Sequence, residues 1–93
     1  MLYTKHALTE MENEDFGVIK DQEISELFEN FDIIKEYSDD KPYPSALLSG
    51  YTKKRRPLHV VCAINKNDNI IIIVTVYHPD PNKWIDNKRR LKK

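Results

Sequence analysis

The chain has 93 residues, with 15 basic and 15 acidic side chains, so its formal net charge at pH 7 is zero. This length is typical of one domain, and the 40% hydrophobic content suffices for a core, which excludes a wholly disordered protein. Residues 1–50 carry 4 basic and 12 acidic side chains, whereas residues 51–93 carry 11 and 3. The basic second half predicts either an anionic partner or only a basic sheet edge beside acidic helices.

Location is indicated by the absence of certain segments. Cys62 is the single cysteine, so the chain does not depend on an internal disulfide. The first twenty residues contain no apolar block of signal-peptide length. The longest apolar run, Ile70 to Val74, is far below the roughly 20 residues that cross a bilayer. We therefore expect a cytoplasmic protein with no membrane segment.

Two helices are predicted in the acidic half. Thr4 is a suitable N-cap for a first helix that continues to about Asp15, and Gly17 suits the turn after it. Asp21 is a suitable N-cap for the second helix. Its apolar stripe has the i, i+3, i+4, i+7 spacing of a core-facing helix and consists of Ile24, Leu27, Phe28 and Phe31.

Strands are predicted at residues 32–37, 45–52, 58–64 and 70–77. The last two are joined by a short polar loop and should form a hairpin. Pro79 and Pro81 end the sheet, and the tail after about residue 82 is expected to be partly extended, with Trp84 as its one large anchor. Residues 1–93 are therefore predicted to form a single α+β domain, with two N-terminal helices on one face of a roughly four-stranded antiparallel sheet.

Alternation along the hairpin predicts two unlike faces. If Ile64 pairs with Ile70, the even-numbered residues of both strands form a wholly apolar face, which the helices should cover. In that register His59 lies opposite Thr75 and diagonal to Tyr77 on the odd-numbered face. The basic turn of Lys53, Lys54, Arg55 and Arg56 arrives at the same end. One patch is thus expected to collect an imidazole, a phenol and several cations.

Such groups suit metal-independent RNA cleavage. An imidazole can act as base or acid, a phenol can protonate the leaving oxygen, and cations stabilise the crowded phosphate. We therefore expect His59 and Tyr77 to be catalytic and Lys53, Lys54, Arg55 and Arg56 to bind RNA. His6, on the first helix with Glu10 one turn on, is a further candidate acid or base. The alternatives are a structural hydrogen bond at the sheet rim for His59 and Tyr77, and a solvated side chain for His6.

No metal or cofactor is predicted. The histidines and Cys62 show no close metal-ligand spacing. The chain also lacks a phosphate-binding glycine loop, a dinucleotide-binding motif and a nucleophile elbow.

Three segments together resemble a family of small bacterial and archaeal domains without an assigned function. They are Thr4–Ala7 with Met11, Pro57–Val61, and Thr75–Pro81 followed by Lys83 and Trp84. Members resemble the RelE, ParE and MqsR toxins in fold, and are often encoded beside a zinc-finger antitoxin-like or helix-turn-helix protein. The resemblance covers nearly the whole chain and implies a RelE-like fold and a toxin–antitoxin role. RNA, free or ribosome-bound, would be the target, and a cognate antitoxin the partner.

The resemblance carries over His6, His59 and Tyr77 as site residues. It does not carry over two arginines that the family usually has on the first helix, because Glu10 and Glu14 stand there. Two other functions stay open: a non-catalytic protein-binding module, and a ParE-like toxin that acts on a protein instead of RNA.

Overall fold

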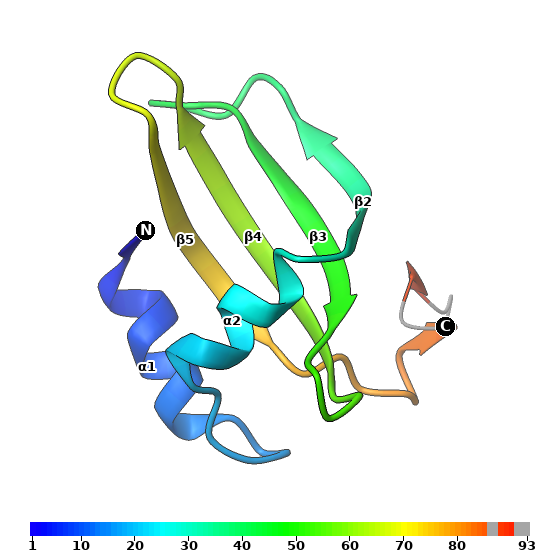
Figure 1. Cartoon of the computed structure of the whole chain (residues 1–93). Coiled ribbons are helices and arrows are strands. Elements are labelled where there is room, and N and C mark those ends of the chain that lie inside the picture. The colour runs from blue at the N-terminus through cyan, green and yellow to red at the C-terminus, as the bar shows by residue number, and fades with distance from the viewer. Residues whose placement is uncertain (86–87, 91–93) are drawn as a thin grey trace.

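Two short helices precede most of the sheet in the computed structural model, which describes residues 1–85 and 88–90 (Figure 1). Helix α1 spans Lys5–Asn13, and the Thr4 hydroxyl caps it by accepting the Ala7 N–H at 3.0 Å, as predicted. Helix α2 spans Asp21–Leu27 and has Lys20, one residue earlier than predicted, at its N-cap. It also ends early, because the β-forming residues from Phe31 onward continue as a strand.

The main sheet has five strands in the order β1-β5-β4-β3-β2. Their bounds are β1 Leu2–Tyr3, β2 Phe31–Tyr37, β3 Ser45–Tyr51, β4 Pro57–Asn65 and β5 Ile70–Tyr77. The strands β2 to β5 pair antiparallel, whereas β1 pairs parallel to β5. The prediction of a four-stranded antiparallel sheet is thus corrected to a mixed five-stranded sheet. A two-residue strand has no hydrophobic period by which the sequence could reveal it.

A β-bulge in β5 changes which side chains face the helices. His59 pairs with Tyr77 and not with Thr75, and Val61 pairs with Thr75 while Cys62 pairs with Ile73. Val74 is therefore the extra residue. Beyond it the alternation reverses, so Ile73 and not Ile72 lies under the helices. The expectation that the even-numbered face is continuous was wrong for the loop-side half of β5.

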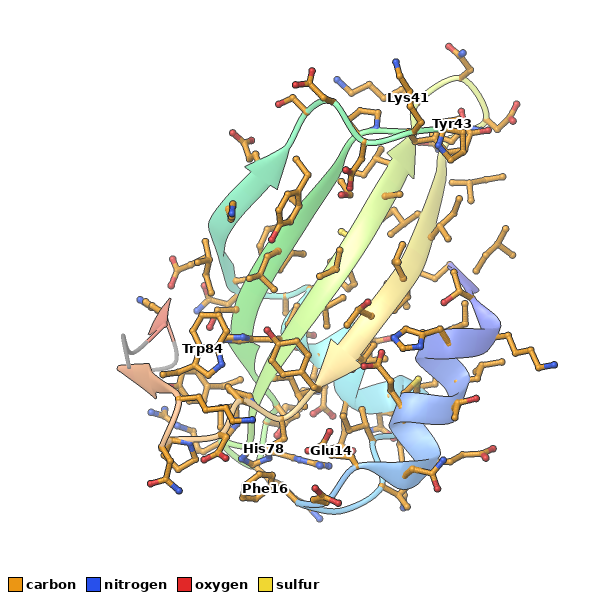
Figure 2. All side chains as sticks on the ribbon, turned by 180° about the vertical axis from the view of Figure 1, so that it is seen from behind. Glu14, Phe16, Lys41, Tyr43, His78 and Trp84 are labelled. Atoms are coloured by element: carbon orange, nitrogen blue, oxygen red, sulfur yellow. The ribbon has the colours of Figure 1, made fainter. Side chains whose placement is uncertain are left out.

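The core lies between the two helices and one face of the sheet, here called the helix face. Its buried residues are Ala7, Met11, Ile19, Ile24, Leu27, Leu48, Leu58, Val60, Cys62, Ile73 and Val76. Phe28 is only partly buried against this core, and Phe31, which belongs to β2, is 39% exposed. The opposite side of the sheet, here called the open face, carries no helix (Figure 2). Strand alternation places His59 on the open face, because its neighbours Leu58 and Val60 lie in the core.

The tail returns to the sheet as a second, two-stranded hairpin. It pairs β6 (Trp84–Ile85) with β7 (Arg89–Arg90). The tail was predicted to be partly extended, and the residues of these two short strands have extended backbone. Neither helix in the described ranges has the length and apolar character needed to cross a membrane.

Candidate functional site

His59 and Tyr77 lie together at one end of the open face. His59 sits on β4, between Ser49 of β3 and Tyr77 of β5. Its Nδ1 lies 3.1 Å from the Tyr77 hydroxyl. The indole of Trp84 meets the imidazole edge to face, with ring centroids 4.5 Å apart and planes at 87°. His59 has no exposed surface, and the Tyr77 hydroxyl is a polar group in contact with its ring.

Trp84, from the tail, is the third ring of an aromatic cluster with His59 and Tyr77. Its ring centroid lies 6.5 Å from that of Tyr77, and Figure 2 shows the indole at the end of the sheet where the chain leaves β5. Aromatic rings in such edge-to-face and tilted arrangements add to the stability of a cluster beyond the area that they bury. Trp84 was predicted as an anchor of the tail, but the sequence did not indicate that His59 would be its partner.

Arg56 is held inside the fold, unlike the other predicted RNA-binding cations. Its guanidinium donates to the Val18 carbonyl at 3.0 Å and to the Gly17 carbonyl. It also pairs with both carboxylate oxygens of Glu23 at 3.2 Å. Its side chain is 18% exposed. Arg56 therefore ties the loop between α1 and α2, and α2 itself, to the start of β4.

His78 also contacts Arg56, and it was not among the predicted site residues. The contacts of Arg56 with Gly17, Val18, Glu23 and His78 are here called the clasp. The Nδ1 of His78 accepts from Arg56 Nε at 3.3 Å, which places the proton of the neutral ring on Nε2. The ring stacks on Phe16, with centroids 4.5 Å apart (Figure 2). Burial lowers the pKa of His78, and the charge of Arg56 lowers it further, whereas Glu14 and Glu23 act in the opposite direction. The ring is therefore biased toward its neutral form.

A small cavity of about 250 Å³ opens beside this clasp. It is lined by Glu14, Asp15, Phe16, Tyr77, His78, Asp80, Lys83 and Trp84. Tyr77 is thus shared between the cavity and the buried contact with His59. The sequence feature that could have indicated His78 as a site residue is its position directly after Tyr77, at the end of a predicted strand.

The remaining three cations of the basic turn are exposed. The Thr52 N–H donates to the Arg56 carbonyl, and Arg55 has a positive φ of 70°. This tight turn directs Lys53, Lys54 and Arg55 away from the core. Within the described ranges, none of the three forms an ion pair. Lys53 and Lys54 line a pocket together with Glu23 and Glu26 of α2, whereas Arg55 lies toward the ring of Tyr51.

Two cations lie over tyrosine rings, and both tyrosines are on the open face. Arg55 lies 5.5 Å from the ring centroid of Tyr51, and Lys35 lies 5.3 Å from that of Tyr37. Tyr51 pairs with Pro57, and Pro57 lies two residues before His59 on β4. Side chains two residues apart on a strand point to the same face, so Tyr51 is on the same side of the sheet as His59. The open face thus combines exposed positive charge with aromatic rings.

His6 stands apart from this site. It lies on α1, which packs on the helix face, so the sheet separates it from His59. Its side chain is 67% exposed and pairs with Glu10, with Nε2 and Oε1 3.3 Å apart. Glu10 also accepts the Val76 N–H at 3.1 Å. His6 and His59 therefore do not share a site in this structure.

Among residues 1–85 and 88–90, no three histidine, cysteine or acidic side chains are grouped as metal ligands. Cys62 is buried in the core, and burial raises the pKa of its thiol. This thiol belongs to the packing of the helix face.

A family model described as "Domain of unknown function (DUF4258)" matches residues 3–78. The match includes both helices and the strands β2 to β5, and it ends at His78, before Trp84. No curated protein and no solved structure matches the chain.

Proposed function

The chain belongs to the DUF4258 family of domains of unknown function, and we propose that it binds RNA across its open face and cleaves it without a metal, as the toxin of a toxin–antitoxin pair. The observation that supports this best is the arrangement around Tyr77. At the end of the open face where β3 ends and β4 begins, Arg55 lies over the ring of Tyr51, and the phenol of Tyr77 lies within hydrogen-bond distance of the buried imidazole of His59.

Binding would use the phosphates and the bases of a single strand. Lys53, Lys54 and Arg55 would neutralise phosphates. Tyr51, which is 44% exposed, offers a ring on which a base can stack. Single-stranded RNA suits this surface better than a duplex, because only unpaired bases can turn toward a flat aromatic platform.

Cleavage would proceed by attack of the ribose 2′-oxygen on the adjacent phosphorus. The bond to the 5′-oxygen breaks, the 2′-hydroxyl proton passes to water, and a 2′,3′-cyclic phosphate forms. Tyr77 would give its proton to the leaving 5′-oxygen, and water would return the proton released by the 2′-hydroxyl to the Tyr77 oxygen. His59, whose Nδ1 lies 3.1 Å from that oxygen, would act through Tyr77 as a positioning residue.

The test compares the parent with Tyr77→Phe, which keeps the ring and removes only the hydroxyl. With single-stranded RNA and a chelator present, the variant should bind as the parent does and cut about 10²–10⁴-fold more slowly. Tyr37→Phe, at the other end of the open face, is the matched control and should cut at the parent rate. Cyclic-phosphate ends on the products would support the chemistry. Equal rates for the parent and Tyr77→Phe would refute it.

A second candidate is a binding module without catalysis, and the complete burial of His59 favours it. In that case the parent binds RNA with a steep salt dependence and does not cut it, either free or on ribosomes. If it neither binds nor cuts RNA, a toxin that acts on a protein, as ParE-like toxins do, becomes the better proposal.

A further inference from the structure

The helix face is covered at one end and bare at the other. Along β4, Leu58 and Val60 are completely buried, whereas Ile64 on the same face is 42% exposed. On β2, Ile33 is 54% exposed and pairs with the buried Leu48. Figure 1 shows both helices over the part of the sheet where β3 ends and β4 begins, which leaves the opposite end uncovered. Apolar side chains thus continue beyond the helices that should bury them.

This bare region forms a groove with a cavity volume of about 450 Å³. Its lining is Phe28, Phe31, Ile33, Glu36, Ser38, Pro44, Ser45, Ala46, Leu48, Cys62, Ile64, Lys66 and Ile71. Only Glu36 and Lys66 are charged, and the remainder is mostly apolar. Contiguous exposed apolar surface of this kind marks an interaction site more often than scattered single residues do.

A strand added to the sheet edge is a poor fit for this region. The edge strand β2 has a bulge between Ile33 and Lys35, which disturbs the row of backbone groups that an added strand would need. Lys88 of the tail also pairs with Asp32 near the start of the same strand, with Nζ and Oδ2 2.8 Å apart. An occupant is therefore expected on the face of the sheet and not along its edge.

Charge around the groove selects the chemistry of the occupant. In the segment 29–40, Asp32 is already paired with Lys88, and Asp40 accepts a hydrogen bond from the Ser45 hydroxyl. The acidic residues of this segment that remain for a partner are Glu29, Glu36 and Asp39, against Lys66 on the groove wall. Complementary charge steers association and disfavours like-charged partners. A partner is therefore expected to present apolar side chains flanked by lysine or arginine.

We propose that this groove binds the apolar face of a basic amphipathic helix from a partner protein. Helix α2 already shows how a helix packs on this sheet, since Ile24 and Leu27 bury completely against it. The incoming helix would lie on the uncovered part of the same face beyond Phe28. Apolar residues at i, i+4 and i+7 would reach Ile33 and Ile64. The groove is on the opposite side of the sheet from Tyr77, so an occupant would not cover the residues proposed to contact RNA.

The test uses three synthetic peptides of about four helical turns. The first places leucines on one helical face and lysines on the other. The second replaces each lysine by glutamate, and the third scrambles the order of the first. Titration against the full chain should give binding by the first peptide at least about tenfold tighter than by either control, a difference of about 1.4 kcal/mol.

Substitutions then locate the contact. Ile33→Ser and Ile64→Ser should each weaken binding of the lysine peptide about tenfold, because each removes exposed apolar surface from the groove. Leu8→Ser is the matched control, since Leu8 is 48% exposed on α1, outside the groove, and its loss should leave affinity unchanged. Circular dichroism checks that the variants fold.

Four results would overturn the proposal. Equal binding of the glutamate peptide would show that the charge of the partner does not matter. Equal binding of the scrambled peptide would show that an apolar helix face is not what the groove recognises. Unchanged affinity in both groove variants would place the contact elsewhere. A parent chain that self-associates, and that Ile33→Ser converts to a monomer, would make a second copy the occupant. None of these outcomes depends on whether the open face binds or cleaves RNA.

Discussion

Arg55 and Arg56 are neighbours of identical chemistry, yet the structure gives them opposite roles. Arg56→Ala removes bonds to the Gly17 and Val18 carbonyls, the pair with Glu23 and the contact with His78. A hydrogen bond to a charged group typically contributes about 1.5–3 kcal/mol, and the carboxylate left behind is partly exposed, with 21% of its side chain accessible. Solvent therefore offsets part of the loss, and we expect the free energy of unfolding to fall by about 2–4 kcal/mol.

Arg55→Ala is the matched control. Among residues 1–85 and 88–90, the only contact described for its side chain is the one with the ring of Tyr51, which at an exposed site is worth about 0.5–1 kcal/mol. Urea and thermal unfolding followed by circular dichroism measure both variants. For a domain of this size the Arg56 variant should lose about 10–30 °C in melting temperature, whereas the Arg55 variant should change by a few degrees.

RNA affinity should show the reverse order. Arg55→Ala should weaken binding to single-stranded RNA and make its logarithmic salt slope shallower by about 0.7, the value for one phosphate contact. Arg56→Ala, measured where it remains folded, should bind as the parent does. Equal stability of the two variants would refute the stabilising role of the contacts that Arg56 makes. A larger loss of affinity in the Arg56 variant would refute the assignment of the RNA-facing cation.

Two further predictions concern stability. Gly50→Ala should lower the free energy of unfolding by about 1–3 kcal/mol in urea unfolding, because the added Cβ would lie 2.9 Å from Leu27 Cγ and 3.1 Å from the Asn30 carbonyl oxygen. A neutral effect would mean that α2 can shift away from β3. Since the pKa of His78 is lower in the folded state than its ordinary value of 6.5, the unfolded chain binds more protons below that pH. The contribution of His78 to stability is therefore present above about pH 6.5 and lost on acidification. Between pH 7 and 5, the free energy of unfolding should fall less for His78→Gln than for the parent. An equal dependence of the free energy of unfolding on pH in the two proteins would contradict this.

Much of the fold could be predicted because its strongest signals are local. The strands β4 and β5 are long runs of β-branched residues, and their bounds agree with the prediction within one residue at each end. The parallel strand β1 could not be found, since it depends on a distant partner and not on its own two residues. The bulge at Val74 was also hidden, because an apolar residue fits either face of this strand.

The site was predictable in part. Alternation within the hairpin was enough to place His59 and Tyr77 on one side, although it gave the wrong partner for His59. It could not separate Arg55 from Arg56, because that difference comes from one positive φ in a turn. Nor could it show that Trp84 covers His59, since the path of the chain after Pro79 and Pro81 is not fixed by any periodicity.

The pairing of β1 with β5 has a consequence for folding during synthesis. Thr4, which caps α1, also donates its hydroxyl to the Val74 carbonyl, 70 residues further along the chain. On a translating ribosome, the first strand must therefore wait until almost the whole hairpin has emerged. Closing so long a loop has an entropic cost before any long-range contact forms, which slows folding. The nascent chain is thus expected to stay protease-sensitive until β5 leaves the exit tunnel, and then to become protected in a single late step.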